Sequence, residues 1–279
     1  MRGIVGELAE RGVRYTLLAA DRFGKAYTTK TLKSGSKLRI RTADRLGHRI
    51  AIEERFEPKV RKRIQETVRP GMTVLDIGAN FGYYTVEMAH LVGPAGRVIA
   101  FEPQLRMVAE LKANLEINGL DNVLVCTAAL SSETGTRTFY LPAAGNEGFG
   151  SFCNNGRAEI AEVTVVPCAT LDRSLSEIGI ANVDFVKMDA EGAELQIVEG
   201  GLGVFAGAHR PAVVFEACEA NCQPFGYCVF DLLRRFDALG FNLVQLDDSD
   251  WCAVPNPAHG SEPSRMCEPA LHTRGPLQA

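Results

Sequence analysis

The stretch Asp76–Thr85, with the sequence DIGANFGYYT, is the feature that most constrains the fold of this chain. The apolar run Met72–Leu75 precedes it and a helical pattern follows it, so a strand, a glycine turn and a helix follow one another directly. This succession is typical of α/β proteins, which hold a nucleotide-like ligand at the carboxyl end of a parallel strand. The sequence therefore predicts a ligand site at this turn.

Two side chains of the turn indicate which ligand it suits. In a dinucleotide fingerprint the second glycine lets a pyrophosphate lie against the backbone, but here Asn80 follows Gly78 at that spacing. Asp76 also brings a negative charge, which repels phosphates and attracts a cofactor that carries an ammonium and a sulfonium. The turn thus favours S-adenosylmethionine (SAM) and argues against the alternative, an NAD-dependent dehydrogenase.

Strand and helix patterns alternate after the turn. Strands are expected at Met72–Ile77, Arg97–Phe101, Asn122–Thr127, Val183–Met188 and Ala212–Phe215, and helices at Gly82–Leu91, Leu105–Ile117, Glu194–Phe205 and Val229–Leu239. Phe241–Leu246 and Trp251–Val254 favour a terminal antiparallel hairpin. The predicted class is α/β: a doubly wound, mostly parallel, seven-stranded Rossmann-like sheet with an antiparallel terminal hairpin.

Three parts are expected along the chain: an N-terminal helical and hairpin extension (1–68), the ligand-binding domain (69–255) and a mobile tail (256–279). In the extension, helical periodicity is weak up to about residue 30, Lys37–Thr42 alternates as a strand does, and Glu54–Val68 has the spacing of a helix.

An insertion is expected between the third and fourth strands. Thr136–Leu141 and Val163–Val166 have strand patterns, and Gly148–Gly156 lies between them. That loop is either a lid, with Phe149 and Phe152 shielding a ligand, or a disordered surface loop.

Acidic residues end or follow several predicted strands. Glu102 ends the second strand about 20 residues after the turn, where an acid can bind both hydroxyls of a ribose. Asp189 follows the fourth strand, with Glu191 nearby, and Glu216 follows the fifth. Because the carboxyl ends of strands one, four and five are neighbours, Asp76, Asp189 and Glu216 should converge. Such a cluster can hold cations, bind a divalent metal or supply a general base with a raised pKa.

Two further polar residues belong to the same region. Asn80 either donates to the amino-acid part of the cofactor or caps the helix that begins near Gly82. Lys187 lies within the fourth strand, where we expect it to be half-buried and paired with a carboxylate. His209 is expected at the opposite, amino end of the sheet, which argues against a histidine base.

Composition excludes some classes of function. The formal net charge of −4 gives no basic footprint for nucleic acid. No run of about 18 apolar residues predicts a membrane span, and charged residues interrupt the start of the chain where a secretion signal would be apolar, so the cytoplasm is expected. Of eight cysteines, Cys126 and Cys168 are expected in the core. Those near the carboxyl end lack paired C-x-x-C spacing, which favours reduced thiols over a metal site: Cys218, Cys222, Cys228, Cys252 and Cys267.

Several separate motifs occur in the order and spacing of one known family. They are Asp76–Thr85, Phe101-Glu102-Pro103, Asn114–Gly119, Thr170-Leu171-Asp172, Lys187–Glu194 and Phe215-Glu216. Over roughly residues 35–250 the chain resembles the FkbM-type SAM-dependent methyltransferases. The resemblance implies a class I methyltransferase fold and O-methylation of a hydroxyl on a sugar, polyketide or related metabolite. N-methylation of a peptide or amino group is the alternative, and a non-catalytic SAM-binding protein is the alternative from another class.

The resemblance also implies roles for individual residues. Cofactor contacts are implied at Asp76, Gly78, Ala79, Asn80, Gly82, Tyr83, Glu102, Pro103, Ala128 and Asp189. Catalytic roles are implied for Asp189, Glu191 and Glu216, and Thr127–Ala129 offers no acid for the adenine amino group. We favour a carboxylate base without a metal over one that uses Mg²⁺. The expected partners are a small-molecule or glycan acceptor and, in a possible homodimer, a second copy of the chain.

Overall fold

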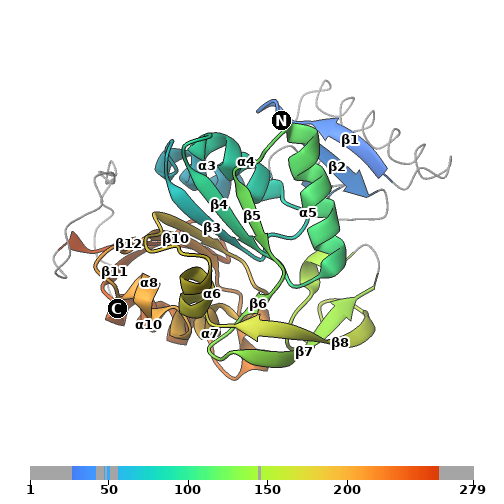
Figure 1. Ribbon diagram of the computed structural model, residues 1–279. Coiled ribbons are helices and arrows are strands. Elements are labelled where there is room, and N and C mark those ends of the chain that lie inside the picture. Colours follow the sequence, from blue (N-terminus) through green and yellow to red (C-terminus); the bar gives the residue numbers. More distant parts are fainter. Residues whose placement is uncertain (1–26, 42–46, 48, 51–55, 144–145, 258–279) are drawn as a thin grey trace, which may run out of the picture.

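The computed structural model describes residues 27–41, 47, 49–50, 56–143 and 146–257 (Figure 1). Its centre is a seven-stranded sheet in the order β11-β12-β10-β9-β3-β4-β5. The parallel strands are β3 (Thr73–Ile77), β4 (Arg97–Phe101), β5 (Val123–Cys126), β9 (Phe185–Met188) and β10 (Ala212–Glu216). β12 (Asp250–Pro255) is antiparallel to both of its neighbours, β10 and β11 (Phe241–Gln245). The predicted fold class is confirmed, terminal hairpin included.

Helices cover both faces of this sheet (Figure 1). One face packs against α3 (Pro58–Thr67), α4 (Tyr83–Val92) and α5 (Leu105–Asn118). The other packs against α6 (Leu171–Glu177), α7 (Glu194–Glu199), α8 (Leu202–Phe205) and α10 (Val229–Ala238). Successive strand residues alternate between the two cores, so Val74 belongs to the first and Leu75 to the second. Burial on both faces makes the sheet a rigid support for the loops at its edge.

The order of the strands creates a switch point between β3 and β9. From β3 the chain proceeds to β4 and β5 on one side, and then returns to build β9 and β10 on the other. The loops that leave β3 and β9 therefore diverge, and a crevice forms at their carboxyl ends.

The insertion forms a second, smaller sheet. β6 (Ala129–Leu130), β8 (Ile160–Ala169) and β7 (Gly135–Pro142) pair in the order β6-β8-β7. The two predicted insertion strands are confirmed and are longer than expected. A single 3-10 turn, η1 (Glu147–Phe149), lies between β7 and β8.

Several details differ from the sequence-based expectations. The predicted helix Glu194–Phe205 is split into α7 and α8 by Gly200 and Gly201, and the chain at Gly200 lies so close to Ser131 that a Cβ there would be 2.2 Å from its carbonyl oxygen. The helix expected over Glu54–Val68 begins only at Pro58, whose fixed φ suits the first helical turn. β1 (Tyr27–Thr31) is a strand paired with β2 (Lys37–Arg41), although its first residues fell within the weak helical periodicity. Helix α6 was not predicted.

Other expectations fall on residues outside the described ranges. These are the helical periodicity of residues 1–26 and most of the tail, from residue 258 onward. The boundaries of the three parts stay predictions. Among the described residues, no helix combines the length and apolarity needed to cross a membrane.

Candidate functional site

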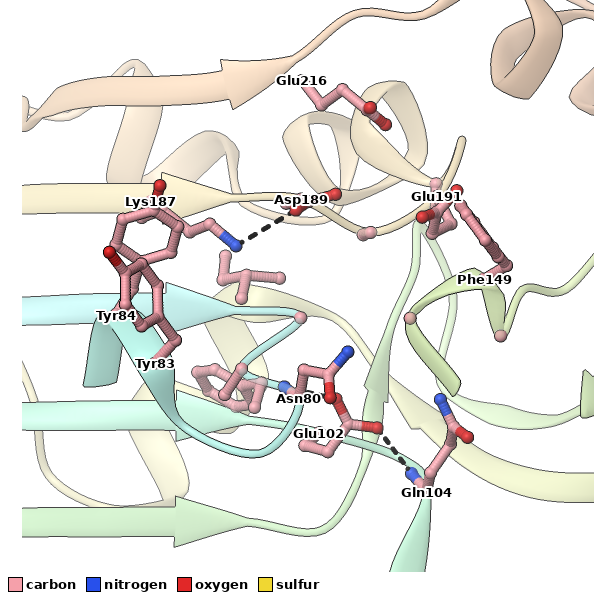
Figure 2. Close-up of a pocket in the computed structure, with 18 of the residues that line it drawn as sticks. Asn80, Tyr83, Tyr84, Glu102, Gln104, Phe149, Lys187, Asp189, Glu191 and Glu216 are labelled. Atoms are coloured by element: carbon pink, nitrogen blue, oxygen red, sulfur yellow. Dashed lines mark hydrogen bonds and ion pairs between the residues drawn. The ribbon is translucent and has the colours of Figure 1, made fainter. Parts of the chain in front are cut away.

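A cavity of about 680 Å³ opens at the carboxyl ends of β3, β4, β9 and β10 (Figure 2). This volume is within the range of sites that enclose small ligands and cofactors. Ten of the twelve site residues expected from the sequence line it: Gly78, Ala79, Asn80, Tyr83, Glu102, Pro103, Ala128, Asp189, Glu191 and Glu216. The convergence of strands one, four and five on one site is confirmed.

The turn after β3 is packed tightly against the end of β9. Gly78 has a φ of 78°, and a Cβ there would lie 1.8 Å from the Asp189 carbonyl oxygen. Asn80 follows in the same left-handed region at 52°, and its backbone N–H donates to Glu102 Oε2 at 2.8 Å. The turn, Glu102 and Asp189 are therefore held together as one unit.

Asn80 does not cap helix α4. The capping position belongs to Gly82, which has no side-chain cap, and Asn80 Oδ1 accepts instead from the backbone N–H of Phe81 at 2.7 Å. The capping alternative is thus wrong. The amide of Asn80 faces the cavity, where its nitrogen is able to donate to a ligand (Figure 2).

Glu102 is buried and fixed by the backbone. Besides the bond from Asn80, Oε1 accepts from the N–H of Gln104 at 2.9 Å, and the residue is only 3% exposed. Burial raises the pKa of Glu102 to about 7, while the two backbone hydrogen bonds oppose that shift. Each oxygen keeps a second lone pair, so this carboxyl is able to accept from a ligand diol.

Asp76 and Gly82 are not among the residues that line the cavity, and the direct cofactor contacts expected of them stay predictions. Asp76 is fully buried and accepts from Thr85 Oγ1 at 2.5 Å. A Cβ on Gly82 would lie 2.4 Å from Leu111 Cδ1, so this glycine allows α4 and α5 to approach each other. Both residues support the turn from behind.

Lys187 is a buried cation between two carboxylates. Its Nζ lies 3.3 Å from Asp189 Oδ2 and 3.9 Å from Asp76 Oδ1, and the residue is 5% exposed. Burial alone would lower the pKa of Lys187, but the charges of Asp189 and Asp76 outweigh it and raise the pKa. The expected pairing is confirmed, with deeper burial than expected, and the ammonium positions Asp189 at the cavity.

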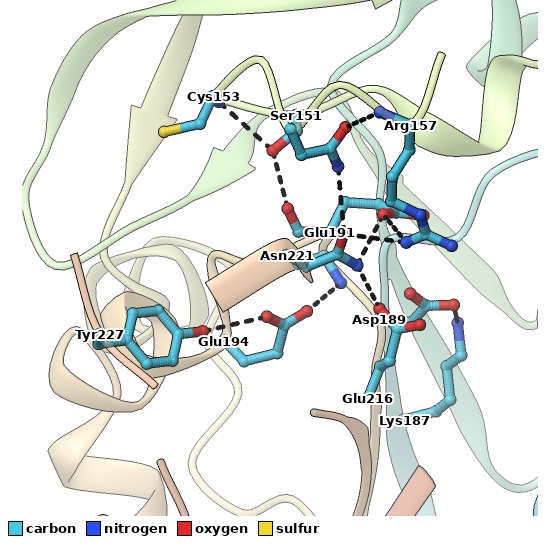
Figure 3. A network of polar contacts seen from close by, with 12 residues as sticks. Ser151, Cys153, Arg157, Lys187, Asp189, Glu191, Glu194, Glu216, Asn221 and Tyr227 are labelled. Carbon is cyan, nitrogen blue, oxygen red and sulfur yellow. Dashed lines mark hydrogen bonds and ion pairs between the residues drawn. The ribbon is translucent and has the colours of Figure 1, made fainter. Parts of the chain in front are cut away.

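Carboxyl oxygens of Asp189, Glu191 and Glu216 lie within 4.8 Å of one another. Asn221, in the short helix α9 (Glu219–Cys222), donates through Nδ2 to Glu191 Oε2 at 2.9 Å and to Glu216 Oε2 at 2.7 Å (Figure 3). Arg157 Nη1 also donates to Glu191 Oε2, at 2.9 Å. Three such carboxyl groups suit a divalent cation, but Arg157 and Asn221 already donate to two of them.

Two carboxyl groups of the acidic cluster, Glu191 and Glu216, have raised pKa values. Burial and then the negative charge of Asp189 raise the pKa of Glu191 to about 8, against the opposing effect of Arg157. The same two causes raise the pKa of Glu216 well above its ordinary value. Both shifts favour the protonated forms of Glu191 and Glu216 more than in ordinary carboxyls.

The insertion loop is bonded to this cluster. Phe149 and Phe152 line the cavity, as the lid hypothesis expects. Ser151 Oγ donates to the Glu191 carbonyl oxygen at 2.8 Å, and Asn155 Nδ2 donates to Asn221 Oδ1 at 3.1 Å (Figure 3). These bonds fix the loop beside the cavity, and its closure over an acceptor stays a prediction.

Sequence reasoning missed several residues that line the cavity, notably Glu57, Tyr84, Gln104, Arg157 and Asp250. The run of acids at 247–250 was a visible signal, since it lies in the hairpin loop beside β10. Glu57 and Arg157 carried no local signal, because tertiary packing alone brings them to the site.

His209 and the cysteines of the described ranges, which the sequence places outside the cofactor site, do not line the cavity. His209 Nε2 lies 3.0 Å from Asp184 Oδ1, and His209 does not line the cavity. The seven cysteines in the described part of the chain are free, and none belongs to the group of potential metal ligands found there. Cys168 is buried as expected, whereas Cys126 is only partly buried.

Comparison with known proteins bears directly on this site. The model of a family described as the methyltransferase FkbM domain matches residues 76–243, the segment that runs from the turn to β11. This match covers more than half of the chain.

Individual relatives are more distant. The chain is 27% identical over 157 residues to the 2-O-methyltransferase NoeI of Sinorhizobium fredii, covering 51% of this chain and 63% of NoeI. It is 26% identical over 223 residues to the AMB antimetabolite synthetase AmbE of Pseudomonas aeruginosa, covering 65% of this chain and 10% of AmbE. The chain thus spans less than two thirds of the length of either relative.

Among solved structures, the chain is similar to the methyltransferase FkbM from Methylobacillus flagellatus KT. The TM-score is 0.45 at 16% identity, covering 69% of this chain and 49% of that one.

Proposed function

The chain belongs to the FkbM family of SAM-dependent methyltransferases, and on that premise we propose that it methylates a hydroxyl oxygen of a small metabolite or glycan. One observation carries the proposal: the Gly78–Asn80 turn, Glu102 and Asp189 line a single cavity of about 680 Å³. The name of one relative, a 2-O-methyltransferase, supports oxygen as the methyl acceptor.

The residues present suit SAM in three respects. Glu102 is preorganised by two backbone N–H groups to accept from a ribose, and Asn80 presents an amide to the cavity. Pro103 and Ala128 offer apolar surface for an adenine at the far end. The cluster around Asp189 favours a positively charged ligand. When bound, SAM supplies a methyl group on a positively charged sulfur, so that reactivity is built into the cofactor.

The protein must then orient the acceptor and accept its proton. Asp189 is best suited to be the base, because it lines the cavity and Lys187, 3.3 Å away, holds its carboxylate in place. As the acceptor oxygen loses its proton, one oxygen of the Asp189 carboxylate takes it up. Glu191 and Glu216, whose pKa values are raised, are able to donate to other hydroxyls of the acceptor when they hold a proton.

Exclusion of water falls to the insertion loop. Phe149 and Phe152 contribute apolar surface to the cavity, and Arg157 anchors the end of the loop to Glu191. A closed, apolar cover strengthens the electrostatic interactions beneath it and protects the reacting groups from hydrolysis.

The decisive experiment incubates the purified protein with methyl-labelled SAM and a panel of sugars, polyketides and amines. Mass spectrometry measures S-adenosylhomocysteine and locates the label. We expect label on oxygen, unchanged rates in the presence of a chelator, and weakened SAM binding in Glu102→Ala.

The other outcomes separate the competing functions. Label on nitrogen alone would identify an N-methyltransferase, and SAM binding without any transfer would favour a non-catalytic role. Loss of activity with chelator and recovery with Mg²⁺ would replace the metal-free base with a metal-assisted one.

A further inference from the structure

Three non-glycine residues in the described part of the chain have a left-handed backbone, and all three line the cavity. They are Glu57 at a φ of 43°, Asn80 at 52° and Glu191 at 51°. Such conformations are unfavourable for residues other than glycine and gather at functional sites. Asn80 and Glu191 belong to the turn and the acidic cluster already described. Glu57 belongs to neither of these and precedes the family match, which begins at residue 76.

The surroundings of Glu57 fix its carboxyl toward the cavity. It stands immediately before α3, where Pro58 begins the helix. The hydroxyl of Tyr84, in the first turn of α4, donates to Glu57 Oε2 at 2.8 Å. Burial and then the charge of Asp189 raise the pKa of Glu57 to about 7, so the carboxyl lies in a position that a cation would stabilise.

The position of Glu57 along the cavity indicates which part of a ligand it meets. Glu102 stands at the end of β4, on one side of the turn, whereas Lys187, Tyr84 and Glu57 line the cavity on the other side. A cofactor whose ribose is held by Glu102 extends past the turn toward this second group. The amino-acid end of SAM therefore arrives there.

That end is a zwitterion, and both of its charges find complements. Its carboxylate is favoured by the amino terminus of α4 and by the Lys187 ammonium. Its ammonium requires an acceptor that is not already committed to Lys187. Glu57 meets that requirement, since the Tyr84 hydroxyl donates to Oε2 and the second carboxyl oxygen is left as an acceptor.

We propose that Glu57 binds the ammonium group at the amino-acid end of SAM, a role that rests on the proposed function. The segment before the family match thus contributes a binding residue to the cofactor site. Because Tyr84 orients the carboxyl, Tyr84 is a positioning residue for the same contact.

The test compares ligands that differ only in the amino-acid end. Calorimetry measures the affinity of the full chain for S-adenosylhomocysteine and for methylthioadenosine, which lacks that end. We expect Glu57→Gln to weaken S-adenosylhomocysteine binding about tenfold, the typical value of one charge-assisted hydrogen bond, and to leave methylthioadenosine within twofold. Glu66→Gln is the matched control, since Glu66 lies on the same helix with its side chain 52% exposed beside Lys62.

Each outcome decides between the two proposals. Equal weakening of both ligands by Glu57→Gln, or no weakening of either, overturns the role of Glu57. Failure of the unmodified protein to bind either ligand would instead overturn the proposed function. If Glu57→Gln does not fold, Tyr84→Phe takes its place and should show a smaller loss confined to S-adenosylhomocysteine. An equal loss for both ligands in Tyr84→Phe overturns the inference as well.

Discussion

Asp189 is the residue on which the proposed chemistry depends. We expect Asp189→Asn to lower turnover by about 10²–10⁴-fold, the usual contribution of a general base, while SAM affinity changes only a few-fold. Single-turnover rates and calorimetry on the same preparation measure the two effects. Asp237→Asn, at an exposed position of α10, is the control. A parallel loss of turnover and affinity would remove Asp189 from the role of base.

Gly78 tests how closely the turn and Asp189 are joined. Alanine there meets the Asp189 carbonyl oxygen at 1.8 Å, in addition to an unfavourable φ of 78°. Gly71 has a φ of 86° with no atom near its would-be Cβ, so Gly71→Ala carries the backbone cost alone, about 1–2 kcal/mol. We expect Gly78→Ala to destabilise the protein more than Gly71→Ala in urea unfolding, and to abolish SAM binding. Equal effects would mean that the turn has room to move.

At the scale of elements, helix α5 connects the N-terminal hairpin to the ligand turn. Asn114 Oδ1 accepts from the N–H of Arg39 at 2.6 Å, and its Nδ2 donates to the carbonyl of Phe81 at 2.8 Å. Asn118, one helical turn further on, bonds within the described part of the chain only to Lys37 of the hairpin and to α5 itself. One buried amide thus holds the hairpin and the residue next to Asn80.

This difference makes the two asparagines a matched pair. We expect Asn114→Ala to cost about 1–3 kcal/mol of stability, because it leaves buried backbone groups unpaired, and to weaken SAM binding as well. Asn118→Ala should loosen the hairpin and leave SAM affinity unchanged. Thermal unfolding and calorimetry measure both effects. An equal loss of SAM affinity in the two variants would show that the hairpin, rather than the turn, transmits the change.

The order of elements was predictable because each one has its own local signal. Apolar runs and glycine turns marked the strands of the main sheet, and their ends shifted by only one or two residues. The predicted helix Glu194–Phe205 is in fact interrupted at Gly200 and Gly201, where the chain packs closely against Ser131 and Leu171, which lie far away in sequence. The prediction for the residues of β1 was wrong for a similar reason, since the pairing of β1 with β2 outweighs a weak helical pattern.

The site was predictable to the extent that it follows the strands. Glu102, Asp189 and Glu216 occupy strand ends, and the topology brings those ends together. Glu57 and Arg157 come from a helix start and an insertion loop, whose placement depends on packing over long sequence distances. Asp76 is not among the lining residues, because its carboxyl is fully buried and accepts from Thr85, which the sequence does not reveal.

At the scale of the whole molecule, the modest net charge of −4 conceals an uneven distribution. Eight carboxyl groups line the cavity against three cationic side chains: Glu57, Glu102, Asp189, Glu191, Glu216, Asp247, Asp248 and Asp250 against Arg49, Arg157 and Lys187. Like charges that lie close together raise the free energy of the unliganded folded protein. A bound cation lowers that free energy again. The cavity is therefore a source of instability that a positively charged cofactor relieves.

This distribution predicts how stability depends on pH. The pKa values of Glu57, Glu102 and Glu194 are raised to about 7, and that of Glu191 to about 8, with burial the leading cause in each. Between the unfolded value, about 4.3, and these folded values, the folded state binds more protons than the unfolded state. The free energy of unfolding of the unliganded protein should therefore fall as the pH rises across that window.

Urea unfolding at about pH 5.5 and about pH 8 measures this fall, which we expect to reverse the usual gain that carboxylates give a protein above their pKa. Asp231 does not interfere, because hydrogen bonds from Cys228 and Arg234 lower its pKa to about 2, so that its effect ends below the window. Glu194→Gln removes one buried carboxyl whose neighbours are Ala190 and Tyr227, and it should make the fall with pH less steep. Saturating SAM should stabilise the protein more at pH 8 than at pH 5.5, since its positive charges favour the ionised carboxylates. A free energy of unfolding that stays level or rises toward pH 8 would show that these carboxyls are not kept protonated by the fold.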